Sequence, residues 1–175
     1  LNAEWLAGDG DLAFPTVVRF HSVLGAFDVA LYEQDTPLTV ENFLNYVTDG
    51  DYNNTFIHRA AAGFVIQGGS HHWGEDGNSP IETDPPVDNE PGRSNVRGTI
   101  AMAKLPGQPN SATAGWFINL ADNADPLDRQ NGGFTAFGEV LGDGMAVVDE
   151  IVALPTTNLG GDFATLPVRD WEEGD

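Results

Sequence analysis

One arginine and one glutamine stand among mostly small and apolar residues in the stretch from Phe56 to Gly69. The whole chain carries 7 basic residues against 27 acidic ones. Because charge is already abundant in such a chain, an arginine within an apolar stretch is not needed for solubility. We therefore interpret Arg59 as a functional side chain and Gln67 as the polar group that accompanies it.

Strand alternation gives this stretch a geometry. Two strands, residues 55–59 and 64–68, joined by a turn of small residues at 60–63, would bring Arg59 and Gln67 close together beside Phe64. This hairpin would place a guanidinium, an amide and an aromatic ring beside one another. A buried hairpin with a purely structural arginine is the alternative that this stretch alone leaves open.

The spacing Phe-x-His-Arg-x(4)-Phe-x-x-Gln-Gly-Gly in this stretch resembles the signature of the cyclophilins, which are peptidyl-prolyl cis-trans isomerases. Two further pairs of blocks resemble later segments of that family in the expected order: residues 97–103 with 111–119, and residues 134–140 with 144–149. Together the matches cover roughly residues 15 to 155. Residues 52–55 and 97–103 are most similar to bacterial single-domain members.

The resemblance implies a mainly β fold, an eight-stranded antiparallel closed β-barrel capped by two α-helices. It also implies a prolyl isomerase that accelerates rotation of Xaa-Pro bonds in peptides and folding proteins. That rotation has a barrier of about 18–20 kcal/mol because it breaks amide conjugation. No covalent bond has to be made, so a catalyst needs only to favour the twisted amide, whose prolyl nitrogen becomes basic. Arg59 would donate a hydrogen bond to that nitrogen.

By the same resemblance, Phe64 and Gln67 join Arg59 as catalytic residues, with Gln67 binding the substrate carbonyl. An apolar pocket for the proline ring would be built from Phe64 and, further along the chain, Met102, Phe117 and Leu127, with the backbone of Ala103 open to an extended peptide. Met102 and Phe117 could instead belong to the barrel core.

Three positions depart from the usual family pattern. A glutamine is replaced by Gly115, a tryptophan by Pro126, and a histidine or tyrosine by Phe134. Gly115 and Phe134 are substrate-binding positions in the family, so we expect isomerase activity with an altered hold on the substrate and weak or no binding of cyclosporin. The same departures leave a second possibility open: a proline-peptide-binding or chaperone module with little turnover.

The remaining pattern predicts the other elements. Strands are expected at residues 16–21 and 26–32 around a turn at 22–25, and helices from residue 36, 37 or 39 to 49 and from 145 to 153. Residues 1–13 look like an extension on the surface of a single domain, 14–175. Residues 70–95 look like one long surface loop. The family's final hydrophobic strand is either short here or cut off, because the chain ends in Trp171 and four acidic or glycine residues.

Composition narrows the function classes. A net charge of −20 and a pI near 4.1 disfavour nucleic acid and anionic membranes as partners. No stretch approaches the roughly 18 to 20 apolar residues of a spanning helix. The absence of cysteine excludes disulfides and thiolate chemistry.

His71 and His72, with Glu75 and Asp76, could ligate zinc or nickel in a metal-binding accessory protein, but adjacent histidines on a loop are more often simply solvated. We therefore predict no metal and no cofactor.

The expected partners are proline-containing peptides and unfolded client proteins, and we expect a monomer. The lack of cysteine, a first residue other than methionine and the similarity to exported bacterial members favour a periplasmic or exported protein over a cytoplasmic one.

Overall fold

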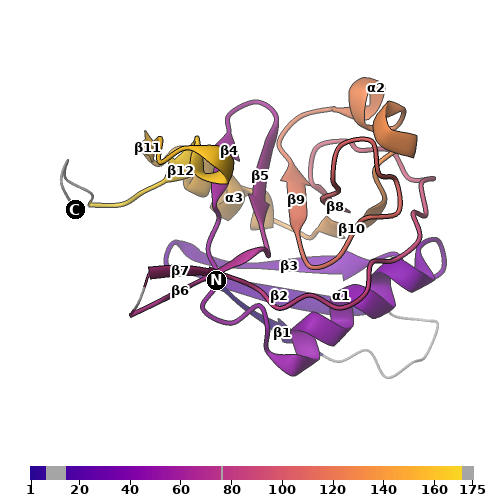
Figure 1. Ribbon diagram of the computed structural model, residues 1–175, viewed down its shortest axis with the longest axis horizontal. Coiled ribbons are helices and arrows are strands. Elements are labelled where there is room, and N and C mark those ends of the chain that lie inside the picture. Colours follow the sequence, from indigo (N-terminus) through magenta and orange to yellow (C-terminus); the bar gives the residue numbers. More distant parts are fainter. Residues whose placement is uncertain (7–14, 76, 171–175) are drawn as a thin grey trace.

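One antiparallel sheet of eight strands dominates the protein (Figure 1). The computed structural model describes residues 1–6, 15–75 and 77–170. In hydrogen-bonded order the strands are β1 (Asn2–Trp5), β2 (Val17–Ser22), β3 (Gly25–Leu31), β10 (Ala136–Val140), β8 (Thr99–Met102), β9 (Trp116–Asn119), β5 (Val65–Gly68) and β4 (Arg59–Ala61). The expected β2–β3 hairpin is confirmed, with Ser22 opposite Gly25 at its turn.

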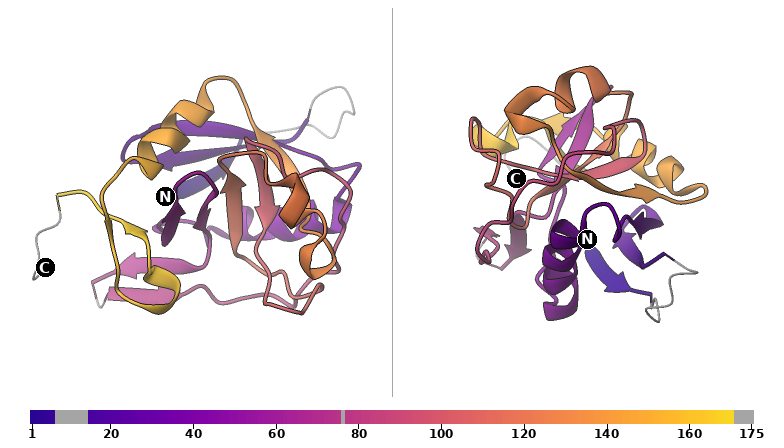
Figure 2. Two further views of the ribbon diagram at one scale, coloured as in Figure 1. Left: turned by 90° about the horizontal axis from the view of Figure 1, so that it is seen from above. Right: turned by 90° about the vertical axis from the view of Figure 1, so that its right-hand side faces the viewer.

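The sheet curls strongly but does not close into the barrel that was expected (Figure 2). Among the described residues no ladder joins the end strands, β1 and β4. The outer edge of β4 is taken by the C-terminal segment instead, because the Ala60 amide donates to the Thr165 carbonyl at 2.8 Å. Leu1 and Thr55 exchange backbone hydrogen bonds, which brings the N-terminus beside the segment that leads into β4. The prediction of eight antiparallel strands is therefore confirmed, and full closure overstates it.

Two helices cover the main core. Helix α1 (Pro37–Asp49) packs beside β1, and α3 (Gly144–Val152) packs beside β3 and β4 (Figures 1 and 2). Both lie close to their predicted ranges. In α1 the buried face includes Val40, Phe43 and Val47, which share one side of the helix because they are three and four residues apart. The centre of the Phe43 ring lies 4.9 Å from the centre of the Phe137 ring on β10, so this helix packs on the middle of the sheet.

The ends of α1 are fixed by residues that suit them. Pro37 occupies the first turn, where its missing N–H costs nothing. The Glu90 carboxylate accepts hydrogen bonds from the amides of Leu38 and Thr39, which places an anion at the positive end of the helix. Gly50, at φ 81°, ends the helix in the left-handed conformation that glycine adopts most easily.

Several segments differ from the sequence-based expectations. Residues 2–5, placed in a surface extension, form β1 and pair with β2, and Ala3 is buried. The expected loop at 70–95 contains a hairpin of β6 (His71–Gly74) and β7 (Gly77–Pro80), which is mostly polar and so shows no alternation of apolar residues. A third helix, α2 (Ala124–Leu127), and the 3-10 turns η1 (Gln130–Gly132) and η2 (Gly161–Phe163) were not predicted.

The C-terminal segment contains two short strands. Strands β11 (Thr156–Thr157) and β12 (Leu166–Pro167) pair with each other, and β12 lies beside β4. Residues 171–175 lie outside the described residues. In the described part of the chain, no helix has the length and apolar character needed to cross a membrane.

A matched pair of glycines tests how tightly the sheet packs. Gly63 and Gly69 both have a φ of 73°, but a Cβ on Gly63 would meet open space, whereas one on Gly69 would lie 2.5 Å from the Trp116 ring. Gly63→Ala should therefore cost only the strain of a left-handed alanine, about 1–2 kcal/mol. Gly69→Ala should cost a further ~1–3 kcal/mol from overpacking. Denaturant unfolding of both variants measures the difference, and equal losses would contradict this account of the packing.

Candidate active site

Seven of the residues predicted to act together line one pocket of about 190 Å³. They are spread over residues 59–134 of the chain: Arg59, Phe64, Gln67, Ala103, Phe117, Leu127 and Phe134. Two further residues, Val65 and Lys104, complete the lining. The sequence therefore identified most of this pocket before its shape was known.

Strand register brings the polar and aromatic groups into one row. Arg59 on β4 stands opposite Gln67 on β5, Gln67 stands opposite Phe117 on β9, and Phe117 stands opposite Ala101 on β8. Paired residues of neighbouring strands project to the same face of a sheet, so the row lies on the pocket side. The predicted strands 55–59 and 64–68 are displaced, because β4 begins only at Arg59 and Phe64 belongs to the turn before β5.

The guanidinium lies where the sequence predicted it, beside an amide and an aromatic ring. Arg59 Nη1 donates to Gln67 Oε1 at 3.4 Å, a long hydrogen bond, and its central carbon is 5.8 Å from the centre of the Phe64 ring. Arg59, Gln67 and Phe64 are all half-buried. The arrangement keeps the guanidinium at the edge of a sheltered cavity, where its N–H groups can reach a bound molecule.

The floor and the far wall of the pocket are apolar. Ala101 and Ala136 are fully buried beneath it, and their small side chains leave the space open. Phe117 and Phe134 meet edge to face, with ring centres 5.7 Å apart. Leu127, from α2, is buried against the same group. A small apolar ring fits such a cavity, because its burial removes apolar surface from water without leaving a polar group unpaired.

A buried set of asparagines holds the pocket wall from behind. The Phe64 carbonyl accepts hydrogen bonds from Leu120 N and Asn123 Nδ2 at 2.8 and 2.9 Å. Asn123 also binds Asn119, and Asn119 binds Asn95. Asn95 in turn donates to the carbonyl of Phe134, so this network joins the two aromatic sides of the pocket. Fully satisfied buried polar groups of this kind fix one arrangement of the segments they connect.

Two predicted pocket residues lie elsewhere. Met102 is 1% exposed and belongs to the main core, where it stands opposite Trp116, so its alternative assignment to the barrel core is the correct one. Gly115 does not line the cavity, although its carbonyl accepts the Ala103 amide at 2.9 Å. Pro126 is exposed on α2.

Sequence reasoning missed Val65 and Lys104. Val65 is two residues before Gln67 on β5, so strand alternation places it on the pocket face, whereas Met102 is one residue after Ala101 and faces away from it. For Val65 this signal was available in the sequence, because Gln67 was already assigned to the site. Lys104 is the only lysine of the chain, but nothing in its surroundings in the sequence predicts that it lies in a pocket.

His58 is buried and lies next to His71, with ring centres 5.4 Å apart. Burial, reinforced by His71, lowers the pKa of the His58 imidazole to about 4. Its Nδ1 has no hydrogen-bond partner among the described residues. The ring is therefore neutral at pH 7 and adds no charge beside Arg59.

The two adjacent histidines do not converge on one point. His71 packs against His58 and Phe163, whereas His72 Nδ1 lies 3.1 Å from the carbonyl of Asn53. Asp76 lies outside the described residues. Across residues 1–6, 15–75 and 77–170, no group of three or more histidine, cysteine, aspartate or glutamate side chains is arranged to hold a metal ion.

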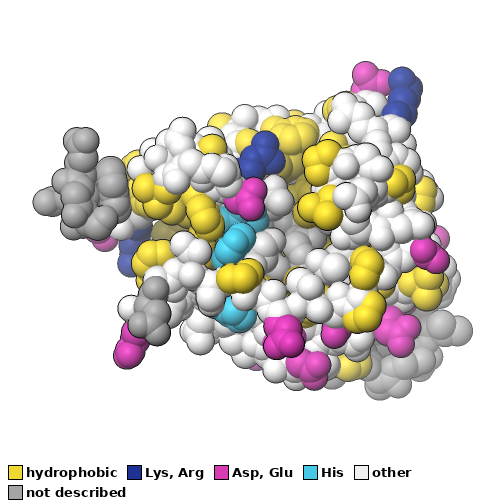
Figure 3. All heavy atoms as spheres, viewed as in Figure 1, with side chains coloured by type: hydrophobic (Ala, Val, Ile, Leu, Met, Phe, Trp, Pro, Cys, Tyr) yellow, Lys and Arg dark blue, Asp and Glu magenta, His cyan; other side chains and the backbone are white. Residues whose placement is uncertain are grey.

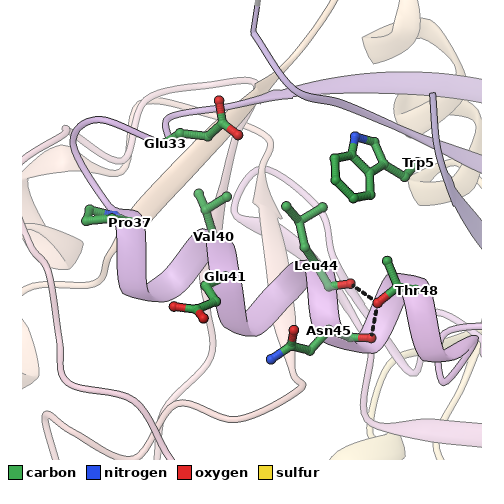
Figure 4. Close-up of a pocket in the computed structure, with 8 residues that line it drawn as sticks. All are labelled: Trp5, Glu33, Pro37, Val40, Glu41, Leu44, Asn45 and Thr48. Carbon is green, nitrogen blue, oxygen red and sulfur yellow. Dashed lines mark hydrogen bonds between the residues drawn. The ribbon is translucent and has the colours of Figure 1, made fainter. Parts of the chain in front are cut away.

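A larger groove, of about 440 Å³, lies between Trp5 and α1 (Figure 4). Leu44 and Val40 point toward it from the helix, and Glu33 and Glu41 stand at its margin. None of the predicted catalytic or substrate-binding residues lines it. Its size alone does not give it a chemistry, so the smaller pocket at Arg59 remains the candidate active site.

Comparisons with known proteins all point to one family. The family model for cyclophilin type peptidyl-prolyl cis-trans isomerase/CLD matches residues 17–170. Peptidyl-prolyl cis-trans isomerase B of Escherichia coli strain K12 is 42% identical over 151 residues, which cover 82% of this chain and 88% of that protein. Peptidyl-prolyl cis-trans isomerase A of Dickeya dadantii is 41% identical over 156 residues, covering 85% and 79%.

Solved structures show the same fold. A crystal structure of a cyclophilin type isomerase from Cryptosporidium parvum aligns with a TM-score of 0.71 over 89% of this chain and 92% of that chain, at 23% identity. A second structure of that protein, in the presence of the dipeptide Ala-Pro, aligns with a TM-score of 0.68 over 87% and 90%, at 24% identity. The chain therefore belongs to the family of cyclophilin-type peptidyl-prolyl cis-trans isomerases, and it is an enzyme that isomerises peptidyl-prolyl bonds.

Proposed function

We propose that the pocket at Arg59 is the place where this isomerisation occurs, with the proline ring between Phe64, Phe117 and Leu127. The observation that carries the proposal is the state of the guanidinium. Among the described residues, Arg59 makes a single long hydrogen bond, to Gln67, and no ion pair with a carboxylate. An arginine has five N–H donors. Arg59 therefore keeps most of its donors available on the pocket side.

The proposed mechanism needs no proton transfer and no cofactor. When the Xaa-Pro bond twists, the prolyl nitrogen loses conjugation and becomes a hydrogen-bond acceptor, which it is not in either planar ground state. A donation from Arg59 to that nitrogen is made only in the transition state, so it lowers the barrier without tightening substrate binding equally. The apolar walls hold the ring while the peptide rotates, and the Gln67 amide binds a substrate carbonyl.

The alternative of a binding module with little turnover loses its support in the geometry. It drew on Gly115, Pro126 and Phe134, but Gly115 and Pro126 do not line the cavity. Phe134 does line it, and its ring adds apolar wall at the side away from Arg59, where it packs on Phe117. The groups to which we assign the chemistry are all present.

The role of Arg59 is tested by Arg59→Ala. Loss of one preorganised donor costs about 100-fold or more in rate in comparable sites. We expect a fall of that size in kcat, with KM changing much less and the fold retained. A protease-coupled or NMR-exchange assay on an Ala-Pro peptide measures both constants.

The matched control is Arg19→Ala, because Arg19 is engaged in a bidentate ion pair with Asp28 on the sheet, away from the pocket lining. Its turnover should equal that of the unmodified enzyme. If Arg59→Ala kept a kcat/KM close to that of the unmodified enzyme, the assignment of Arg59 would be wrong.

The pH dependence separates catalysis from stability. Because His58 stays neutral down to a pKa of about 4 and no proton is transferred, kcat/KM should be flat from about pH 6 to 8. In the unfolded chain His58 regains its ordinary pKa near 6.5, so between pH 6.5 and 4 the unfolded state binds a proton that the folded state does not. The contribution of His58 to the free energy of unfolding is therefore lost as the pH falls through this window.

Urea unfolding followed by tryptophan fluorescence at pH 7, 6 and 5 measures that loss. His58→Gln should weaken this pH dependence, because it removes the buried imidazole. A bell-shaped kcat/KM profile centred near neutrality would argue against a mechanism without proton transfer.

We also propose that cyclosporin binds weakly. In the family its binding draws on a tryptophan at the position of Pro126, and a proline offers neither the indole N–H nor the flat ring. Loss of such a contact costs on the order of 1 to 3 kcal/mol, a roughly ten- to hundredfold weakening. Pro126 is exposed next to Leu127, so a larger side chain can be placed there.

An inhibition titration of the unmodified enzyme, Pro126→Trp and the control Pro126→Ala tests this proposal. We expect Pro126→Trp alone to gain sensitivity, with turnover preserved in all three. Nanomolar inhibition of the unmodified enzyme, or no gain with the tryptophan, would show that this side of the pocket is misread.

Client proteins, a monomeric state and an exported location remain proposals. Proline-containing peptides are the partners of the family, and the dipeptide Ala-Pro was present in one structure of the C. parvum relative. The location rests on the absence of cysteine and on similarity to bacterial members. Sequencing of the complete gene tests it, because an upstream signal segment would support export and its absence would contradict it.

A further inference from the structure

Lys104 lies two residues after the end of β8 and lines the pocket together with Gln67 and Arg59. Its Nζ donates hydrogen bonds to Asn89 Oδ1 at 3.1 Å, to the Asn131 carbonyl at 2.9 Å and to the Gly133 carbonyl at 2.6 Å. It also lies 4.7 Å from the centre of the Phe134 ring, a cation-π distance. All three N–H donors of the ammonium are therefore engaged.

The carbonyls that Lys104 binds belong to a strained turn. Asn131, Gly132 and Gly133 follow one another with φ angles of 51°, 77° and 80°. Glycine adopts such angles readily, but asparagine does so at a cost, and only where neighbouring contacts determine it. Here the contacts include the Lys104 ammonium and Asn89 Nδ2, which donates to the carbonyls of Gly132 and Gly133. Asn131 Nδ2 also donates to the Leu105 carbonyl at 2.9 Å.

This turn connects the two residues of one pocket wall. Leu127 comes before it on α2, and Phe134 follows it directly. The Phe134 amide donates to the Leu127 carbonyl at 2.8 Å, which closes the segment into a loop. A change in the turn therefore moves Leu127 and Phe134 relative to Phe117 on the sheet.

No carboxylate of the described residues competes for Lys104. Among the described residues its charge has only carbonyl oxygens, an amide oxygen and an aromatic face as partners, and no acidic group within ion-pair distance. Replacement of the lysine would consequently leave no unpaired acid behind, so a variant reports on the turn and on the Phe134 ring.

We propose that Lys104 is a positioning residue of the enzyme: its ammonium holds the turn at 131–133 and the Phe134 ring so that the wall of Leu127 and Phe134 is preformed for the proline ring. This inference rests on the proposed function of the pocket. It assigns Lys104 no direct part in the rotation, because none of its donors is free for the substrate.

The experiment compares Lys104→Met, which keeps the length and removes the charge, with Lys104→Arg, which keeps the charge. Steady-state isomerisation of an Ala-Pro peptide by NMR exchange gives KM and kcat separately. We expect Lys104→Met to raise KM about tenfold with kcat within a factor of about two, because ground-state and transition-state binding are lost together. Lys104→Arg should recover most of the loss, a rescue that simple loss of packing does not produce.

Asn89→Ala keeps the test open if Lys104→Met does not fold. Asn89 binds the same turn and does not line the pocket, so its removal should raise KM in the same direction by a smaller factor. An unchanged KM in Lys104→Met, whether or not kcat falls, would overturn the inference. If only Asn89→Ala folds, an unchanged KM in that variant would overturn it.

Arg59→Ala, measured alongside, separates the two levels of the proposal. If it retains full turnover, the proposed site of the reaction fails. If it loses turnover while Lys104→Met keeps an unchanged KM, only the positioning role of Lys104 fails.

Discussion

Strand register is the constraint on which the active site depends. Arg59, Gln67 and Phe117 belong to three different strands, and only the pairing of β4 with β5 and of β5 with β9 puts them in one row. Because side chains alternate along a strand, a shift of one residue on β5 would turn Gln67 toward the core and Ile66 into the pocket. The aromatic core and the asparagine network behind Phe64 hold that register, so fold stability and site geometry have the same origin.

The pocket differs from the rest of the described surface in the pairing of its basic side chains. Acidic side chains far outnumber basic ones, and basic groups are sparse on the face shown in Figure 3. Five basic residues are in ion pairs with aspartate: Arg19, Arg93, Arg97, Arg129 and Arg169. The other two, Arg59 and Lys104, make no such pair among the described residues, and both line the pocket. An unpaired cation in a sheltered cavity keeps its electrostatic strength, because little water and no counter-ion screen it.

The two pocket cations differ in what they bind. Arg59 retains free donors because its only described partner is the Gln67 amide at 3.4 Å. Lys104 has none left, because carbonyl and amide oxygens accept all three. One cation is therefore available to the substrate and the other is committed to the protein. His58, the neighbour of Arg59 in the sequence, is neutral at pH 7. A positive charge on His58 would repel the Arg59 guanidinium and displace it.

The sequence by itself determined the family through its motif spacing, and the period of apolar residues predicted both long helices. The resemblance to the family implied the eight antiparallel strands and, together with strand alternation around Arg59, seven pocket residues. The sequence also contained the signal for Val65, through alternation with Gln67. Only the tertiary structure decided that Met102 faces the core and that residues 2–5 join the sheet. It also decided that Thr165 binds the edge of β4 and that Lys104 binds the turn at 131–133, which is distant from it in the sequence. Those outcomes depend on which segments meet in space, and no local pattern encodes such a meeting.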